Sequence, residues 1–392
     1  MGATDNQNSF LNRISIRRNQ VVSMEGTHDQ ELEDLEHFQK HVADRFLDLL
    51  SPPEDYPSDP FLSIAWIRKL LDVFLCCEAE FKAVVLMGRD PTQITKPPLD
   101  RLVPEFLDRV VKALDICNAV SSGVESVRHF QKLAEIAVSA LEQRPIGDGQ
   151  VRRAKKALNS LVTAMAIEDK EGQTTKATER TWSFGRRTGV SAPNKDRAAG
   201  HFRALSWGMS KGWSSAKQIQ AMSMNLVAPR GNETSSLVQP VYIMSTIMLF
   251  VMWILVTAVP CQERTGLMTH FQVPRNLVWA QSLIGLQDKI AEEWKKKEKK
   301  CAAGLLEELQ KMEKLGQSLI EFADNFQFPA EAERLEEVAA QVAELAEICK
   351  RMEEGLLPLQ QQIRELFHRA VRSRTEVLEV LDQGGKGTPP MM

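Results

Sequence analysis

Apolar residues in the first half of the chain recur every three or four positions, which is the spacing of amphipathic α-helices. Stretches rich in proline or glycine at 51–60, 88–98 and 144–149 interrupt the pattern, because proline lacks a backbone donor and restricts the residue before it. Short connections of this kind predict an antiparallel bundle over 26–168, preceded by a basic, disordered arm at 1–25. The helices predicted between these breaks cover about 27–49, 61–87, 99–143 and 149–168.

The C-terminal third, residues 261–382, carries apolar residues that alternate steps of three and four, as in a coiled coil. Gly355 and Pro358 interrupt this pattern. We therefore expect two helices folded back on each other, or packed on a helix at about 300–325, and not one uninterrupted rod. This heptad seam runs from Leu335 to Val380, and its candidate partner-contact positions are Leu335, Val342, Leu345 and Met352.

Residues 237–260 are the most hydrophobic part of the chain. The run 241–259 has no charge and is apolar on every face, and at 1.5 Å per residue it is about 28 Å long, close to the hydrocarbon thickness of a bilayer. It fits a membrane-spanning helix, a buried central helix of the bundle or interfacial insertion. Lys and Arg residues next to a spanning helix favour the cytoplasmic side of the membrane. Such residues flank this run on both sides, so neither orientation of a spanning helix would be preferred. The residues that mark this candidate membrane segment are Val241, Tyr242, Phe250, Trp253 and Val259.

The segment 169–236 is predicted to be a linker rich in basic residues, serine, glycine and tryptophan. Between 170 and 230 eleven Lys and Arg residues face three acidic ones, a net charge of +8, and few aliphatic residues are present to build a core. Such a segment fits attraction to an anionic cytoplasmic leaflet, where Lys and Arg bind the surface and Trp favours the interface. A merely solvated linker is the alternative, and nucleic-acid binding is disfavoured because no folded platform is predicted. The candidate membrane-surface residues are Arg180, Trp182, Arg186, Arg187, Arg203, Trp207, Lys211 and Trp213.

Two hydroxyl groups in this linker follow basic residues. Arg180 lies three residues before Ser183, and Arg186 and Arg187 directly precede Thr188. Phosphorylation at Ser183 or Thr188 would lower the local positive charge and weaken contact with a membrane. Both residues are therefore candidate regulatory sites.

Composition sets broad limits on the class of protein. Of 392 residues, 43% are hydrophobic and 26% are charged, with a formal net charge of −3, which is ordinary globular usage. The six cysteines form no C-x-x-C pair, and the polar N-terminus carries no secretory signal pattern. We expect a protein of the cytosol and the cytoplasmic face of membranes, with a disordered tail at 383–392.

The sequence carries none of the common catalytic or metal-binding patterns. The chain has no phosphate-binding glycine loop, no nucleophile elbow and no H-E-x-x-H pair. His37 and His41 have the i, i+4 spacing of metal ligands, but the sequence offers no third ligand nearby, so a solvated helix face is the preferred interpretation. We expect no enzyme activity, no metal and no cofactor.

Several strings of residues resemble the plant BYPASS-related family, and in particular its ROH-type members. They are SFLNRISIRRNQ at 9–20, ELEDLEHFQKH at 31–41, LDICNA at 114–119, SFGR at 183–186, LSW at 205–207 and the run 241–259. The resemblance covers the full length and implies a plant-specific, helical, non-enzymatic protein with a predicted membrane segment. It also implies a protein partner, the peripheral lipid-binding subunit of the exocyst, which tethers secretory vesicles. The oligomeric state stays open.

Two hypotheses for function follow. In the first, the chain is a membrane-associated adaptor or regulator of secretion and cell-wall or mucilage deposition, in which 170–259 brings helical docking surfaces to the bilayer. The heptad seam is the candidate partner surface. The alternative is that its apolar residues pack against other helices of the same chain and form part of the core. In the second, the chain is a soluble cytosolic scaffold or developmental regulator without a direct tethering role.

Overall fold

The predicted all-α fold is confirmed. The computed structural model describes residues 24–51, 59–86, 96–168, 213–229, 237–261, 266–297, 304–327 and 332–385, and within them every regular element is helical. These elements are α2 (Met24–Leu50), α3 (Ile64–Leu86), α4 (Leu99–Leu141), α5 (Asp148–Glu168), α6 (Ser215–Ser223), α7 (Val238–Ala258), η3 (Val278–Ala280), α8 (Gln281–Lys297), α9 (Glu307–Asp324) and α10 (Ala332–Gly385).

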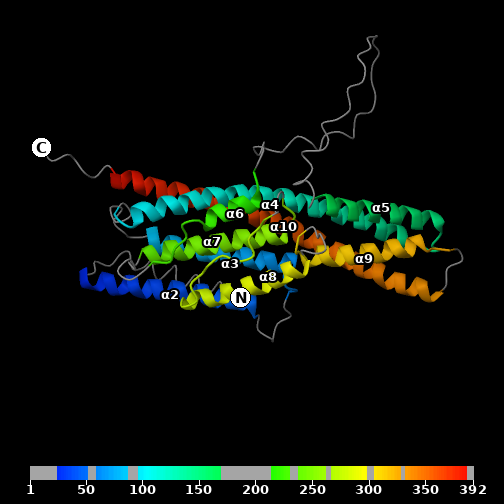
Figure 1. Cartoon of the computed structure of the whole chain (residues 1–392), viewed down its shortest axis with the longest axis horizontal. Coiled ribbons are helices and arrows are strands. Elements are labelled where there is room, and N and C mark those ends of the chain that lie inside the picture. The colour runs from blue at the N-terminus through cyan, green and yellow to red at the C-terminus, as the bar shows by residue number, and fades with distance from the viewer. Residues whose placement is uncertain are drawn as a thin grey trace, which may run out of the picture.

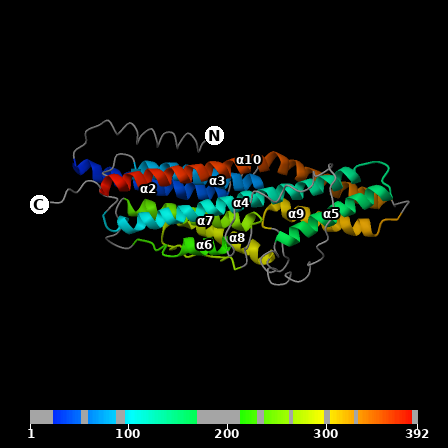
Figure 2. The same ribbon diagram turned by 90° about the horizontal axis from the view of Figure 1, so that it is seen from above.

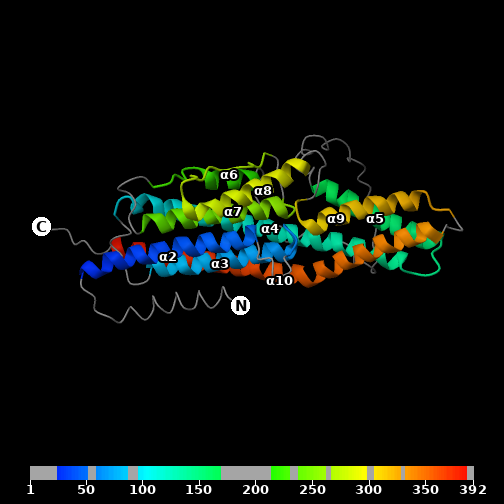
Figure 3. The same ribbon diagram turned by 90° about the horizontal axis from the view of Figure 1, so that it is seen from below.

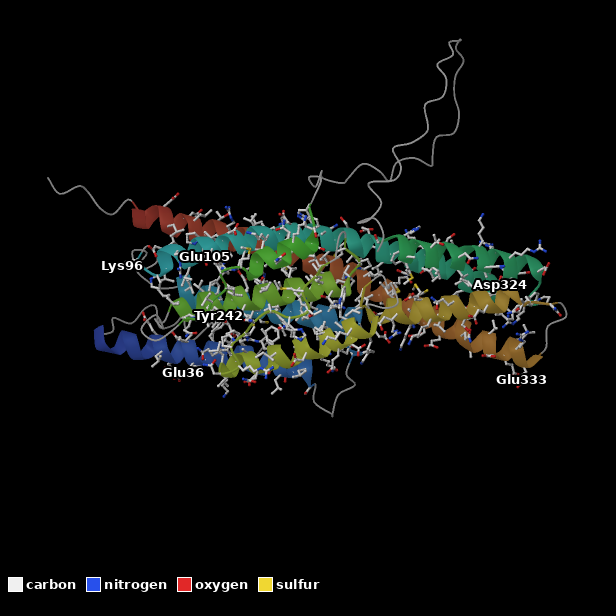
Figure 4. All side chains as sticks on the ribbon, in the orientation of Figure 1. Glu36, Lys96, Glu105, Tyr242, Asp324 and Glu333 are labelled. Atoms are coloured by element: carbon white, nitrogen blue, oxygen red, sulfur yellow. The ribbon has the colours of Figure 1, made fainter. Side chains whose placement is uncertain are left out.

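The described helices form an elongated bundle in which α4 and α10 follow most of the long axis (Figures 1 and 2). At one end they pack with α5 and α9, and at the other end α2, α3, α6, α7 and α8 gather beside them. Figure 4 shows Asp324 and Glu333 at the first of these ends and Tyr242 in the second. The two long helices therefore join both ends of the molecule.

The hydrophobic segment forms α7, the central helix of the larger end. Every residue of α7 except Gln239 is buried, and the helix contacts α2, α3, α4, α6 and α8. The ring of Phe250 lies 5.8 Å from that of Phe46 on α2 and 6.1 Å from that of Phe271. Length and composition alone would allow α7 to cross a membrane. In this fold the protein itself encloses it, which is the core-helix arrangement.

The C-terminal end of α7 is closed by backbone hydrogen bonds. The last carbonyls of a helix have no partner within the helix, so they need donors from elsewhere when they are buried. The amides of Leu305 and Leu306 donate to the carbonyls of Thr257 and Ala258, each at 3.2 Å. The start of α9 is also tied to α3, because Glu308 accepts the amide of Ile64 at 3.1 Å.

The expected break in the C-terminal third is wrong, because α10 is a single helix of 54 residues with Pro358 inside it. A proline removes one backbone hydrogen bond, and packing of α10 on α3, α4 and α9 along its length outweighs that loss. Gly355 does not end the helix either, because α10 continues through it. A Cβ atom there would lie 2.8 Å from Cγ2 of Ile64, so the glycine allows α10 to approach α3 closely.

A second close approach occurs where α4 crosses the end of α7. A Cβ atom built on Gly123 would lie 1.9 Å from the carbonyl oxygen of Pro260, and a backbone atom cannot move away as a flexible side chain can. We predict that Gly123→Ala lowers the free energy of unfolding by roughly 1–3 kcal/mol, because the core is overpacked there. Urea unfolding followed by circular dichroism measures the change.

Gly149→Ala is the matched control, since no atom lies within 4 Å of the position that its new methyl group would take and no strained backbone angle is present. This substitution in the first turn of α5 should leave stability unchanged or raise it by up to about 1 kcal/mol. Equal stability of the two variants would contradict the close packing of α4 on the end of α7.

Candidate interaction site

Buried charges in the described residues serve to connect helices. Glu80 of α3 is fully buried and accepts two hydrogen bonds from Arg45 of α2, at 2.6 and 3.0 Å. Nδ1 of His41 lies 3.2 Å from the same carboxylate. Burial raises the pKa of Glu80, but hydrogen bonds from His41 and Arg45 outweigh it and bring the pKa below its ordinary value. His41 therefore pairs with a carboxylate of α3, while the neighbouring His37 lies 3.7 Å from Glu33.

Glu78 is a buried carboxylate in a less favourable environment, facing α10. Its Oε1 atom is buried and has no hydrogen-bond partner among the described residues. Burial raises the pKa of Glu78, although Lys82 and Arg369 oppose the shift. Lys82 itself forms an ion pair with Glu376 of α10 at 2.5 Å.

The buried thiols carry no reactive character. Burial raises the pKa values of Cys77, Cys117 and Cys349 to about 12, so each stays a protonated thiol at neutral pH. No group of three or more His, Cys, Asp or Glu side chains within the described ranges could hold a metal ion.

A short helix inside the predicted linker offers a different kind of contact. Helix α6 packs on α4 and α7 and lies at the outer edge of the half that holds α7 (Figures 2 and 3). Its first turn is capped by Ser214, which accepts the amide of Lys217 at 3.4 Å. The α6 residues that face the bundle and are buried are Ser215, Ala216, Ile219 and Met222.

Arg109 of α4 holds the C-terminal end of α6. This arginine is buried and donates from Nε to the carbonyl of Met222 at 3.0 Å and from Nη2 to the carbonyl of Met224 at 3.1 Å. Glu105, one turn earlier on α4, lies 3.6 Å from the guanidinium. Burial lowers the pKa of Arg109, and Glu105 opposes that shift. A cation at this place matches the partial negative charge of a helix C-terminus.

The contact that holds α6 is small. Only Ile219 and Met222 are large apolar side chains among its buried residues, and together they contribute roughly 3–6 kcal/mol before the entropy of fixing the segment is subtracted. The indole nitrogen of Trp213, just before the cap, is buried without an acceptor among the described residues. Helix α6 is therefore attached far more weakly than α7, of which all but one residue is buried.

The residues predicted as sites from the sequence fall into four groups. Val241, Tyr242, Phe250, Trp253 and Val259 are buried in the bundle. In the heptad seam, Val342, Leu345 and Met352 are buried and Leu335 is partly buried against the same core, so in this fold the seam is part of the core. Trp213 is half-buried beside α6. The others lie outside the described residues, namely Arg180, Trp182, Ser183, Arg186, Arg187, Thr188, Arg203, Trp207 and Lys211.

Comparison with known proteins identifies the family. A family model described as Protein ROH1-like matches residues 1–381. The chain belongs to the ROH1-like family. It is 62% identical over 414 residues to protein ROH1A of Arabidopsis thaliana, a match that covers 100% of this chain and 99% of that protein. It is also 44% identical over 405 residues to protein ROH1D of the same plant, covering 97% and 98% of the two chains. No solved structure matches.

Sequence reasoning on this ROH1-like chain missed Arg109 and α6. A signal was present: Ser214 precedes a short run in which Ala216, Ile219 and Met222 recur every three residues, typical of a capped amphipathic helix. The surrounding positive charge led to the interpretation of the whole segment as linker. The local sequence shows only the i, i+4 pair of Arg109 with Glu105. The other partners of Arg109 are backbone carbonyls more than 100 residues away, which no side-chain pattern marks.

Two buried carboxylates of α3 should respond in opposite ways to the same substitution. We predict that Glu80→Gln lowers the free energy of unfolding at pH 7 by about 3–5 kcal/mol, because it leaves Arg45 buried without a counter-charge. Glu78→Gln should instead raise the free energy of unfolding at pH 7, because the folded protein no longer has to bury an ionised carboxylate. Urea unfolding between about pH 3 and pH 7 measures both effects and covers the range in which each contribution changes.

The sign of each pH dependence follows from the direction of the pKa shift. A lowered pKa in the folded state means that Glu80 stabilises the fold above its unfolded pKa of about 4.3 and loses this effect as the pH falls through the folded value. The raised pKa of Glu78 has the opposite sign, so the gain from Glu78→Gln should shrink as the pH falls towards about 4.3. Two variants with the same sign at pH 7 would contradict this assignment.

Proposed function

We propose that this ROH1-like protein is a non-enzymatic helical adaptor that binds a protein partner at the cytoplasmic face of membranes. The observation that carries the proposal is the enclosure of α7, since a helix buried on all sides by its own chain is not available to lipid. In this proposal the fold is a soluble scaffold, and contact with the membrane is peripheral.

The proposed means of membrane contact is the basic segment between α5 and α6. Arg186 and Arg187 lie in a stretch with a large excess of positive charge and interleaved tryptophans. Each Lys or Arg near an anionic leaflet contributes about 1 kcal/mol, so the attraction is reversible and falls with salt. Phosphorylation at Ser183 or Thr188 would weaken it by adding negative charge.

The proposed partner is a subunit of the exocyst, the lipid-binding one that the resemblance to ROH-type proteins implies. The proposal of a binding role is supported by membership of the ROH1-like family and by a bundle in which buried charges connect helices. A scaffold without a direct tethering role is the second candidate, because the heptad seam is used within the core.

A membrane fractionation experiment tests the peripheral attachment. We predict that the intact chain sediments with plant membranes at low salt and is released by alkaline carbonate, because the protein itself encloses α7. The variant Arg186→Gln with Arg187→Gln should bind anionic vesicles about twenty- to thirtyfold more weakly, as expected for the loss of about 2 kcal/mol. Lys295→Gln with Lys296→Gln, two exposed residues of α8, is the matched control.

If the intact chain stays in the membrane fraction after carbonate extraction, α7 is integrated in the bilayer, and the proposal of peripheral attachment is contradicted. Equal loss of vesicle binding in both double variants would mean that total charge, and not the basic segment, is responsible.

A direct binding measurement separates the adaptor from the scaffold. We predict that the purified full chain binds the purified lipid-binding exocyst subunit with a dissociation constant in the micromolar range or below, measured by calorimetry without membranes. A different exocyst subunit tested under the same conditions should not bind. Failure of both to bind would favour the scaffold without a tethering role.

A further inference from the structure

Helix α6 is the shortest of the described α-helices that pack on the core helix α7. The other α-helices that contact α7 span 17 to 43 residues, whereas α6 has 9. It sits at the outer edge of the bundle, with α4 and α7 beneath it. Removing α6 would expose an apolar groove between α4 and α7 without disrupting either helix.

The groove has features that select a helix and its direction. Small residues of α6, Ser215 and Ala216, face the bundle at one end, and the larger Ile219 and Met222 fill it towards the other. This is the i, i+4, i+7 pattern of a helix laid in a hydrophobic groove. Arg109 lies at the end where the helix stops and binds main-chain carbonyls, which every helix presents at its C-terminus.

Nothing in the contact with Arg109 depends on the identity of the α6 side chains. Both hydrogen bonds end on backbone oxygens, so any helix of suitable length could replace them. Holding α6 in place also carries a cost, because the buried indole nitrogen of Trp213, directly before the cap, has no acceptor among the described residues. Displacement of α6 would return this donor to water, so an incoming helix with a longer apolar face and no such cost would compete successfully with α6.

We infer that α6 is a displaceable internal ligand, and that the groove between α4 and α7 is the site where an amphipathic helix of a protein partner docks. The partner helix presents small residues, then large apolar residues four and seven positions later, and directs its C-terminal carbonyls to Arg109. This inference deepens the proposed adaptor function, on which it rests only for the existence of a partner. It does not depend on the partner's identity or on membrane binding.

The test uses a fluorescent peptide of residues 213–229 as the probe helix. In the full-length variant Ile219→Asp with Met222→Asp, the chain's own α6 should leave the groove while α4 and α7 stay folded. We expect this variant to bind the peptide at least tenfold more tightly than the wild-type chain does, measured by fluorescence anisotropy. A peptide carrying the same two aspartates is the matched control and should not bind.

Arg109→Met in the released variant should lower peptide affinity at least tenfold, because it removes both bonds to the helix end. A folded released variant that does not bind the peptide would overturn the inference. Concentration-dependent dimers of the wild-type chain that the peptide dissociates would also overturn it, since the occupant would then be α6 of a second copy.

Hydrogen exchange of the wild-type chain provides a measurement that does not require any variant to fold. Amides of α6 should exchange through local opening at least a hundredfold faster than those of α4 and α7, while the bundle stays intact. If α6 exchanges only with global unfolding, it is a fixed part of the core, and the inference fails. Neither this result nor the peptide result bears on membrane attachment or on the exocyst subunit, so failure here leaves the proposed function standing.

Discussion

A helix that is apolar on every face has no side that can be turned to water, and this constraint on α7 shapes the rest of the fold. Five helices drawn from distant parts of the chain, α2, α3, α4, α6 and α8, cover it. Its buried C-terminal carbonyls then need donors, which come from Leu305 and Leu306 at the start of α9. The heptad seam of α10 packs on α3 and α4, behind this first layer. Enclosure of one helix thus links the two ends of the molecule.

Much of the fold could be predicted from the sequence, because amphipathic periodicity records which face of a helix is covered. The pattern predicted α2, α3, α4 and α5 to within a few residues. The pattern could not show whether α7 spans a membrane or lies in the core, since a helix without a polar face has the same sequence pattern in lipid and inside a protein. The prediction of a break in α10 failed at Pro358 and Gly355 for a related reason. Local propensity was overridden by contacts along the helix, including the close approach to Ile64.

The candidate site was less predictable than the fold, and the chemistry of Arg109 explains why. Buried cations are usually recognised through a carboxylate partner, as Arg45 and Glu80 are paired between α2 and α3. Arg109 has Glu105 one turn away on its own helix, but it also donates to the carbonyls of Met222 and Met224 at the end of α6. Every residue has a backbone carbonyl, so the sequence does not mark that contact. The difference matters for function. A carboxylate partner ties an arginine to one particular residue, whereas a helix end can be supplied by α6 or by another chain.

An adaptor has to be rigid enough to present a surface and still able to exchange one contact for another. In this protein the rigid part is the enclosed α7 with the long helices α4 and α10, where close packing at Gly123 and Gly355 leaves no room for adjustment. Exchange has to occur where little apolar surface is lost, and α6 buries only two large apolar side chains. The proposed basic contact with the membrane is equally reversible, since it depends on charge at the surface and not on insertion. The proposed exchange thus leaves stability and partner binding to different helices of one chain, and a partner helix in the α6 groove would cover again the face of α7 that α6 leaves.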